Sequence, residues 1–549
     1  MRSFLSFYYT RKCPLCQFTV PDILSVIMTT FSLYIKSLRR KPAFRFLKKL
    51  EGEFPLARIF LVGGAVRDIV LNRECKDYDF VVCNVPVKKL QKFLGTLGRV
   101  DLVGRRFGVL KCIPKDARKE LAQGFLEPFD IALPRKEAHI LGIGQYRDFH
   151  IYSDPAIPIE EDLARRDFTI NAMALDVRTG IVIDPFGGFA DLKKKIIRTV
   201  GNPEERFSED YSRMLRALRF AVSFGFAIEE HTAQVLASSI HNLNREVDQP
   251  TAVRVVPYEV IAREILRTFI ADPLRAFDMY DAFHVFDALM PDMIAMKGCP
   301  QPKEWHTEGD VWTHTRMAIR LLASKAFSRT CEKLTEFYPS VFCGITPTLI
   351  IALLLHDIGK PFTLKTPEKN GVDRVRFDGH DRVGADIARD TVKRLRLYTV
   401  SEIGVDPDVV HFLIKHHLLL LNSPEGLKNN TIERYFFKNQ FVGVTLLQLM
   451  FLDAKASRKI DGTSSLNRYN AFCKRLRSFM QRGRARKTLP KPILRGDDIM
   501  DILSVPQSPF VGTVLLALRE EQLAGRVRTK KDARAFVRSR FKNLRLQVV

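Results

Sequence analysis

The sequence lacks a long hydrophobic run and lacks any cluster of cysteines. No apolar stretch approaches the ~18 to 20 residues that a membrane-spanning helix needs, which argues against an integral membrane protein. The nine cysteines are scattered and odd in number, and this usage suits a reducing compartment better than a disulfide framework. One close pair, Cys13 and Cys16, has no second pair or histidine nearby and is weak evidence for zinc. With 46% hydrophobic and 27% charged residues, the composition also argues against a mainly disordered chain.

Acidic residues are scarce at both ends of the chain. Lys and Arg total 87 against 62 Asp and Glu, which leaves a net charge of +25. Residues 1–50 contain one acid and ten basic residues, residues 455–549 contain seven acids and 23 basic residues, and residues 51–454 are neutral. An excess of this size points to a polyanionic partner, either nucleic acid or an anionic membrane surface. Because the basic excess lies at the two ends of the chain, we expect catalysis and polyanion binding to use partly different segments.

The first 50 residues are open to three interpretations. They are basic, nearly free of acids and rich in Ser, Thr and aromatic residues, a composition that resembles an organelle transit segment. A true start at Met28 and a disordered basic arm explain the same composition. We therefore treat residues 1–50 as an N-terminal extension and leave them out of the fold prediction.

Hydrophobic spacing predicts an α+β protein with its strands near the beginning. Short apolar strands are expected at 58–66, 78–83, 109–113, 129–133 and 181–183. From about residue 203 apolar residues recur at helical spacing, most clearly in 211–226, 252–270, 348–355, 409–420 and 441–452. The predicted order is a head that contains the strands (51–200), two helical regions (201–295 and 300–460) and a basic helical tail (461–549).

A glycine turn and two aspartates mark the head. Gly63 and Gly64 follow the first strand, and Arg67 comes one helical turn later. Asp77 and Asp79 are two apart at the start of the next strand, so their side chains face the same way. Two adjacent carboxylates repel unless cations lie between them, and a pair of Mg²⁺ ions held in this way can activate a hydroxyl and stabilise a leaving pyrophosphate.

Four motifs in order carry a family resemblance. They are Gly63-Gly64-Ala65-Val66-Arg67-Asp68 with Lys76-Asp77-Tyr78-Asp79, Arg165-Arg166-Asp167-Phe168-Thr169-Ile170-Asn171, Asp184-Pro185-Phe186-Gly187-Gly188, and Glu209-Asp210-Tyr211-Ser212-Arg213-Met214-Leu215-Arg216-Ala217-Leu218-Arg219. In these motifs the chain resembles the class II tRNA nucleotidyltransferases and bacterial poly(A) polymerases over about residues 57–290. The resemblance implies a polymerase-β-like head with a small mixed sheet, followed by a helical neck and body.

The resemblance also implies roles for individual residues. Asp77 and Asp79 would hold two Mg²⁺ ions, with Asp130 as a third catalytic carboxylate. The incoming triphosphate would be bound by Gly63, Gly64, Arg67, Arg166 and Asn171.

The fourth motif has a physical interpretation as a base reader. Asp210 and Arg213 are three apart on a predicted helix and are therefore neighbours. An Asp accepts from an exocyclic amino group while an Arg donates to the adjacent ring acceptor. Cytosine and adenine both present that pattern, whereas guanine and uracil present the opposite one, so one pair selects C and A without a template. Arg216 and Arg219 continue at the same spacing and are expected to face triphosphate or primer.

A second constellation of histidines and aspartates lies in the later half. Its members are His314, His356, Asp357, His380, His416 and Asp453. Their order resembles the HD metal-dependent phosphohydrolases, which implies a divalent metal of unknown identity and hydrolysis of phosphate esters at RNA ends. His314, His356, Asp357 and Asp453 are the expected ligands, with His380 and His416 serving a second metal or phosphate. A purely structural HD fold is the alternative.

Together these patterns predict a template-independent nucleotidyltransferase that acts on RNA 3′ ends. The favoured reaction adds or repairs the CCA end of tRNA from CTP and ATP, in the cytoplasm unless residues 1–50 direct the chain to an organelle, while the basic tail grips the RNA. A poly(A) polymerase and a partial CC- or A-adding enzyme are alternatives with the same chemistry. A different class, an HD phosphohydrolase with an inactive RNA-binding head, disagrees with the intact head motifs. The sequence leaves the oligomeric state open.

Overall fold

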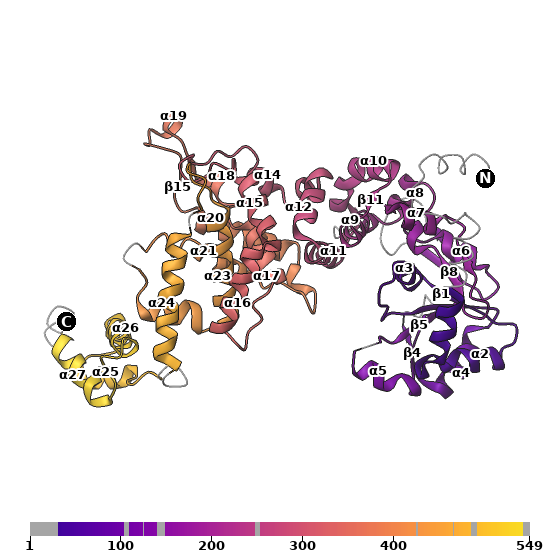
Figure 1. Cartoon of the computed structure of the whole chain (residues 1–549), viewed down its shortest axis with the longest axis horizontal. Coiled ribbons are helices and arrows are strands. Elements are labelled where there is room, and N and C mark those ends of the chain that lie inside the picture. Colours follow the sequence, from indigo (N-terminus) through magenta and orange to yellow (C-terminus); the bar gives the residue numbers. More distant parts are fainter. Residues whose placement is uncertain are drawn as a thin grey trace, which may run out of the picture. The chain divides into compact units, whose positions relative to one another are not determined.

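The computed structural model describes residues 31–103, 109–124, 126–139, 149–247, 253–423, 426–464, 466–484 and 491–541. The chain divides into two compact units, Met1–Val256 and Pro257–Val549 (Figure 1). Cys13, Cys16 and Met28 lie outside the described residues.

A mixed seven-stranded sheet forms the centre of the first unit. Its strand order is β3-β4-β5-β2-β1-β8-β9, and only β2 and β5 run parallel among these neighbours. The strands are β1 (Arg58–Val62), β2 (Asp79–Cys83), β3 (Gly98–Val103), β4 (Val109–Pro114), β5 (Phe129–Ala132), β8 (Ala174–Asp176) and β9 (Val182–Ile183). Four of the five residues of β1 and of β2 are buried, because both strands are apolar and central. The expected small mixed sheet is confirmed.

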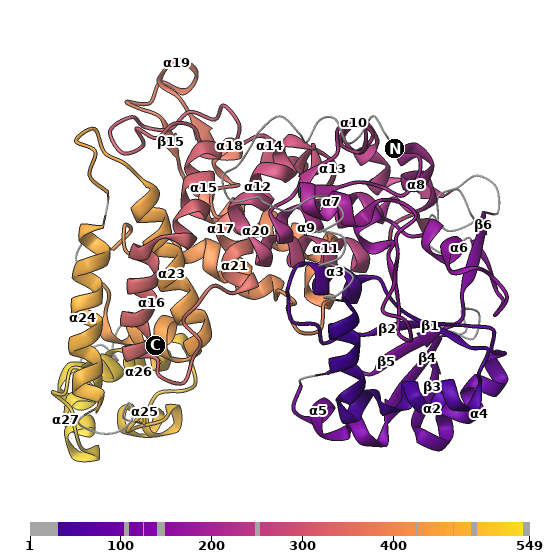
Figure 2. The same ribbon diagram turned by 45° about the vertical axis from the view of Figure 1, so that its right-hand side comes forward.

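Residues upstream of position 51 contribute to the core of this head. Figures 1 and 2 both place α2 (Arg45–Glu53), α4 (Val87–Leu97) and α5 (Arg118–Ala122) on one side of the sheet and α3 (Gly64–Val70) on the other. Phe44 packs against Phe129 with ring centroids 5.0 Å apart, and Phe46 packs against Phe80 at 5.7 Å. Phe44 and Phe46, upstream of the expected boundary at residue 51, thus pack against side chains of the sheet.

Short helices lead from the sheet towards the end of this unit. They are α6 (Ile159–Ala164), α7 (Gly188–Lys194), α8 (Pro203–Glu209), α9 (Ser212–Phe224) and α10 (Glu230–Ser239), preceded by the hairpin of β6 (Arg135–His139) and β7 (Phe149–Ser153). Asn202 caps α8 by accepting from the amide of Glu204 at 3.1 Å, and Gly225, with φ of 68°, ends α9. The change from strands to helices near residue 203 is confirmed.

The second unit is almost entirely helical. Its main helices are α11 (Tyr258–Ala271), α12 (Pro273–Ala282), α15 (Val311–Arg320), α16 (Lys325–Phe337), α17 (Pro347–Leu355), α20 (His380–Arg394), α21 (Pro407–His416), α23 (Gln440–Ala456) and α24 (Asn467–Arg484). The central α23 packs against α15, α16, α17, α21 and α24. Its residues are buried on almost every side, which is the pattern of a core helix.

The last three helices form a small cluster with a hydrophobic core of its own. They are α25 (Gly496–Leu503), α26 (Pro509–Leu523) and α27 (Lys530–Phe541), and buried members include Ile499, Val514 and Val537. An ion pair between Arg519 and Glu433 connects α26 to the preceding helices. Within the part of the chain described here, no helix is both long and apolar enough to cross a bilayer.

Candidate active sites

Two guanidinium groups cover the glycine turn at the end of β1. Gly63 has φ of 69°, which is the left-handed region that suits glycine. A Cβ at Gly63 would lie 2.9 Å from Arg166 Nη1, and a Cβ at Gly64 would lie 3.3 Å from Arg67 Nη2. The backbone of the turn and two cations therefore meet in one place, an arrangement suited to a polyphosphate.

Three carboxylates lie beside this turn. The parallel register pairs Asp79 of β2 with Asp130 of β5, and Asp77 directly precedes β2. Burial and the neighbouring Asp77 raise the pKa of Asp79 to about 7, and Arg166 opposes this shift. The pKa of Asp77 is raised by burial and by Asp130, and burial also raises the pKa of Asp130 although Lys111 Nζ lies 3.7 Å from it. A cation would relieve these costs, and an all-oxygen donor set fits a hard divalent ion.

A chain of polar contacts joins the glycine turn to α9. Arg67 Nη1 donates to Asn171 Oδ1 at 2.7 Å, and Asn171 Nδ2 donates to Asp167 Oδ1 at 3.0 Å. Arg216 donates to Asp167 Oδ2 from Nε at 2.9 Å and from Nη2 at 2.6 Å. Burial opposes ionisation of Asp167, but the Arg216 guanidinium holds its pKa well below the usual range. The turn and the helix are therefore fixed relative to each other by charge-assisted hydrogen bonds.

Arg213, at the start of α9, is oriented by its predecessor Glu209. Its buried guanidinium pairs with the Glu209 carboxylate and donates to the carbonyl of Arg206 at 3.0 Å. The carboxylate of Asp210 accepts from the amide of Ser212 at 2.8 Å, and the amide of Arg213 donates to the Asp210 carbonyl at 3.0 Å. Asp210 and Arg213 are thus neighbours by backbone, and the described contacts include no hydrogen bond between their side chains.

Arg219 lies further along α9. Its guanidinium lies 4.2 Å from the ring centroid of Phe220. The structure thus distributes the four predicted residues of this motif over one helix and its entrance, with Arg216 and Arg213 each held by an acid.

Three histidines in the second unit converge on one aspartate. His356, His380 and His417 each place Nδ1 next to the carbonyl three residues earlier, at 2.8, 2.8 and 2.5 Å respectively. Because a carbonyl only accepts, Nδ1 carries the proton and the lone pair of a neutral ring is on Nε2. These buried Nε2 atoms have no hydrogen-bond partner in the described structure, and they lie 3.3, 3.6 and 3.8 Å from the carboxylate of Asp357. Unpartnered lone pairs around a carboxylate are the donor set of a metal site.

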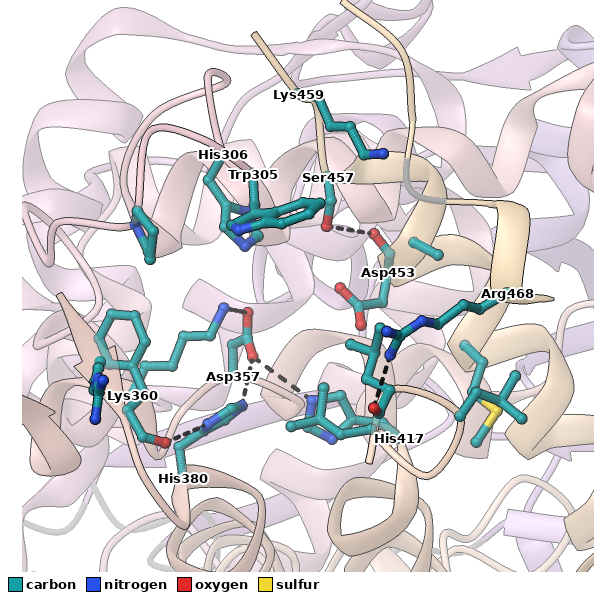
Figure 3. A pocket seen from close by; sticks show the side chains of 18 of the residues that line it. Trp305, His306, Asp357, Lys360, His380, His417, Asp453, Ser457, Lys459 and Arg468 are labelled. Atoms are coloured by element: carbon teal, nitrogen blue, oxygen red, sulfur yellow. Dashed lines mark hydrogen bonds and ion pairs between the residues drawn. The ribbon is translucent and has the colours of Figure 1, made fainter. Parts of the chain in front are cut away.

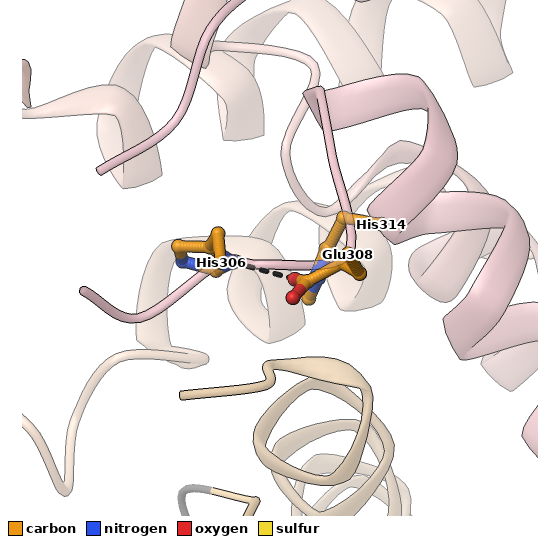
Figure 4. Close-up of side chains that lie close together, drawn as sticks. All are labelled: His306, Glu308 and His314. Atoms are coloured by element: carbon orange, nitrogen blue, oxygen red, sulfur yellow. Dashed lines mark hydrogen bonds and ion pairs between the residues drawn. The ribbon is translucent and has the colours of Figure 1, made fainter. Parts of the chain in front are cut away.

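A fourth histidine, His314, is oriented by side chains (Figure 4). Glu308 Oε1 lies 2.7 Å from His306 Nδ1 and 2.8 Å from His314 Nδ1, while His314 Nε2 lies 3.1 Å from Asp453 Oδ1. Burial opposes protonation of His314, but Asp453 and Glu308 raise its pKa to about 9. Burial lowers the pKa of His417 to about 4, which keeps that ring neutral.

The histidine clusters of the second unit bring possible metal-ligand atoms close together. In the described part of the chain, three groups have ligand atoms that all lie within 4.8 Å of one another: His306–Glu308–His314, His314–His356–Asp357 and Asp357–His380–His417. Asp77, Asp79 and Asp130 do not form such a group.

A cavity of about 850 Å³ opens onto this centre (Figure 3). Asp357, His380, His417 and Asp453 line it. Lys360, buried at its edge, lies 2.7 Å from Asp357 Oδ2 and donates to Gln301 Oε1 at 2.7 Å. A phosphate ester in the cavity would therefore meet both the ligand cluster and a fixed cation.

The structure brings His417, and not the predicted His416, next to Asp357. Successive residues on a helix point about 100° apart, so His416 and His417 at the end of α21 cannot both face the cluster. His417 faces Asp357, whereas His416 packs between Phe412 and Tyr435 with ring centroids 4.6 and 4.7 Å away.

Comparisons with known proteins decide the family. A model described as the poly A polymerase head domain matches residues 59–198, and one described as the HD domain matches residues 340–438. A CC-adding tRNA nucleotidyltransferase of Thermus thermophilus is 30% identical over 484 residues, which are 87% of this chain and 92% of that protein. An A-adding tRNA nucleotidyltransferase of Deinococcus radiodurans is 30% identical over 69% of this chain and 79% of that protein. The chain belongs to the tRNA nucleotidyltransferase family.

Other similarities agree with this family and differ in extent. A multifunctional CCA protein of Nitrosospira multiformis is 34% identical over 309 residues, and the chain covers 62% of its length. A Bacillus stearothermophilus CCA-adding enzyme solved with CTP has a TM-score of 0.54 at 19% identity, over 90% of this chain and 96% of that one. The solved structure supports the fold of this nucleotidyltransferase, a head followed by helical regions.

Two residues that orient site side chains, Asp162 and Glu308, were not predicted from the sequence. Asp162 is fully buried and accepts from Arg165 and Arg166, so it positions the guanidinium above Gly63. Its signal is its place three residues before the Arg165-Arg166 motif. Glu308 has a comparable signal in the sequence, because this carboxylate lies between two histidines, His306 before it and His314 after it.

Proposed function

We propose that this nucleotidyltransferase adds or repairs the CCA end of tRNA from CTP and ATP without a template and releases pyrophosphate. The observation that carries the proposal is the meeting of Gly63, Arg166 and Asp79 at one turn, tied through Asn171 to the helix that bears Arg216. The groups that bind the triphosphate, the metal and the base would then lie along one chain of polar contacts.

The residues divide the chemistry between them. Two Mg²⁺ ions, held by Asp77 and Asp79 with Asp130 nearby, would activate the primer hydroxyl and stabilise the leaving pyrophosphate. Arg67 and Arg166 orient the triphosphate over the glycine turn. Asp210 and Arg213 select the base by its amino group and ring acceptor, and Glu209 holds Arg213 in place.

One incubation tests this proposal. Purified protein is mixed with labelled CTP and ATP, Mg²⁺, and either a tRNA lacking all of CCA or a tRNA ending in CC, and the product length is measured. Three added nucleotides support CCA addition. Two added C residues or one added A support the partial activities named for the relatives from Thermus and Deinococcus, and a long A tract supports a poly(A) polymerase. No product with any of these primers would contradict nucleotidyl transfer.

We further propose that the HD centre hydrolyses phosphate esters at RNA ends. Support comes from the converging Nε2 lone pairs of His356, His380 and His417, which suit a divalent metal. The metal would supply an activated water, while Lys360 holds the phosphate.

Two adjacent histidines provide a sharp test. Phosphatase activity with added divalent metal should be lost in His417→Ala and retained within about two-fold in His416→Ala, because only the first faces the cluster. Equal activity in both variants would remove His417 from the site.

The proposal also covers RNA binding by the basic tail and the cellular location of the protein. Exposed basic residues of α27, such as Lys530, Lys531 and Arg534, would hold the RNA backbone. A cytoplasmic location is supported by the bacterial relatives, with transport into an organelle by residues 1–50 as the alternative.

A further inference from the structure

The cavity beside the HD centre has an aromatic and cationic rim that the proposed metal chemistry does not require. Trp305 is 47% exposed and lines the cavity together with Lys459. The ammonium of Lys459 lies 5.2 Å from the ring centroid of Trp305. The other tryptophan of the chain, Trp312, is only 7% exposed and packs in the core against Phe277. The exposed part of the Trp305 indole is therefore available to a molecule that enters the cavity.

The loops that carry these two side chains are tied to each other. The amide of Thr307 donates to the carbonyl of Arg458 at 2.9 Å, and the amide of Arg458 donates to Glu308 Oε2 at 2.9 Å. The amide of Lys459 also donates to the carbonyl of Thr463 at 2.9 Å, which closes a tight turn. Trp305 and Lys459 are thus held on a paired-loop framework that includes Glu308, the residue that orients His314.

The rim faces the metal-ligand cluster across the cavity. Figure 3 shows Trp305, Ser457 and Lys459 on one side, and Asp357, His380 and His417 on the other. Arg468 lines the same cavity and donates to the carbonyl of Leu421 at 2.8 Å. A bound molecule would therefore meet a flat apolar face at one end and a phosphate-binding centre at the other.

We propose that Trp305 and Lys459 form a clamp that stacks the base of a nucleoside phosphate whose phosphate group lies at the HD centre. This proposal rests on the proposed phosphohydrolase activity and names the part of the substrate that it recognises. Indole stacking accepts every base, because every base has a flat π face, so the clamp selects nucleotides over other phosphate esters without reading sequence. Lys459 adds a positive charge next to the indole and favours an anionic ligand.

Turnover of matched esters tests the clamp. The substrates are adenosine 3′-monophosphate, adenosine 2′,3′-cyclic monophosphate and glycerol 2-phosphate, which has no base. Trp305→Leu should raise KM for the two adenosine esters by about ten-fold and leave kcat within about two-fold, while glycerol 2-phosphate is unaffected. Trp305→Phe should restore most of the affinity. Phe342→Ala, a change at an aromatic side chain that is 70% exposed and lies outside the cavity lining, is the matched control and should change nothing.

Fluorescence gives an answer that does not depend on turnover. Because the chain has two tryptophans and Trp312 is buried, a ligand stacked on Trp305 should quench the accessible emission. Adenosine 3′-monophosphate should quench the wild-type protein but not Trp305→Phe, and glycerol 2-phosphate should quench neither. Stronger quenching by a short RNA ending in the same 3′-phosphate would assign the clamp to RNA ends, and equal quenching would assign it to free nucleotides.

The possible failures are distinguishable. If the wild-type protein hydrolyses none of the esters but the nucleotide still quenches Trp305, the phosphohydrolase proposal fails and the clamp stands as a binding site. Absence of quenching at millimolar nucleotide overturns the clamp. An equal rise in KM for glycerol 2-phosphate in Trp305→Leu also overturns it, because the substitution would then act through the metal centre.

Discussion

Asp79 is the carboxylate of the head whose ionisation is most costly in the folded protein. In the unfolded chain it ionises near its ordinary pKa of 3.8, whereas in the folded protein burial and Asp77 raise the pKa to about 7. The folded state therefore binds a proton that the unfolded state has released between these values. It follows that stability falls as pH rises through this window and stays low above it.

We expect Asp79→Asn to stabilise the protein in EDTA at pH values above this window. The gain should be near zero below about pH 4, should grow up to about pH 7, and should reach an order of 2–3 kcal/mol above it, since one pKa unit is worth about 1.4 kcal/mol and partial exposure reduces the total. Thermal unfolding from pH 4 to 8 measures the difference. Added Mg²⁺ should reverse the order of the two proteins, and Asp116→Asn, at an exposed acid, should show no pH-dependent gain. A pH-independent difference would contradict this account.

Glu209 pairs with Arg213 and should therefore affect the choice of base. Glu209→Gln keeps the shape of the side chain but removes the charge that pairs with Arg213 and Arg206. We expect preference for CTP and ATP over UTP and GTP to decrease about ten-fold, because a base contact of this kind is worth about 1–3 kcal/mol. Relative kcat/KM with the four nucleotides measures it. Glu205→Gln, at an exposed acid of the same helix, should leave the preference unchanged.

Residues with distinctive spacing could be predicted from the sequence, and residues that act through others could not. Asp77, Asp79, His356 and Asp357 stand in short motifs whose chemistry is local. His416 and His417 are adjacent at the end of α21, and which of them faces the cluster depends on how that helix is rotated about its axis. Sequence spacing places a helix end only to within one or two residues and therefore cannot decide between them.

At the scale of the elements, α7 meets the turn before β8 so closely that its first residue, Gly188, has no room for a side chain. A Cβ at Gly188 would lie 2.1 Å from the carbonyl oxygen of Thr169, a backbone atom that a rotamer change cannot move. We expect Gly188→Ala to destabilise the head by about 2 kcal/mol or more, within the range for overpacked cores. Gly95→Ala, in the last turn of α4 with open space around it, should instead stabilise by up to about 0.5–1 kcal/mol. Denaturant unfolding measures both. A neutral Gly188→Ala would mean that α7 can shift freely.

Elements were predictable where their apolar pattern is long. The strands expected near residues 58, 78, 109 and 129 are present as β1, β2, β4 and β5. Two strands of the sheet were missed for different reasons. β3 is an exposed edge strand in which charged and apolar residues alternate only from Arg99 to Leu102, and β8 has only three residues, all buried, so both patterns are too short to indicate a strand.

For the molecule as a whole, the basic excess and the catalytic residues are carried by different parts of the chain. We expect the triple variant with Lys530, Lys531 and Arg534 changed to Ala to bind tRNA more weakly. The slope of log affinity against log salt should decrease by about 2–3, at roughly 0.9 for each phosphate that the variant no longer neutralises. Filter binding at several salt concentrations measures this slope.

A matched control uses exposed lysines of the head. Changing Lys88, Lys89 and Lys92 of α4 to Ala removes the same charge and should leave the slope nearly unchanged. KM for CTP should stay within about two-fold in both triple variants. A uniform loss in both would mean that the net charge, and not the tail, holds the RNA.

The way the HD histidines are oriented has a consequence for how this centre can change over time. Main-chain carbonyls, which no substitution removes, align His356, His380 and His417. Substitution of the surrounding side chains therefore leaves the tautomers of these three rings unchanged. His314 is aligned by Glu308, which one nucleotide change can replace. Three of these four histidines are therefore aligned by the main chain, and the fourth by a side chain that can be replaced. Selection for a different metal or a slower reaction would act first at position 308.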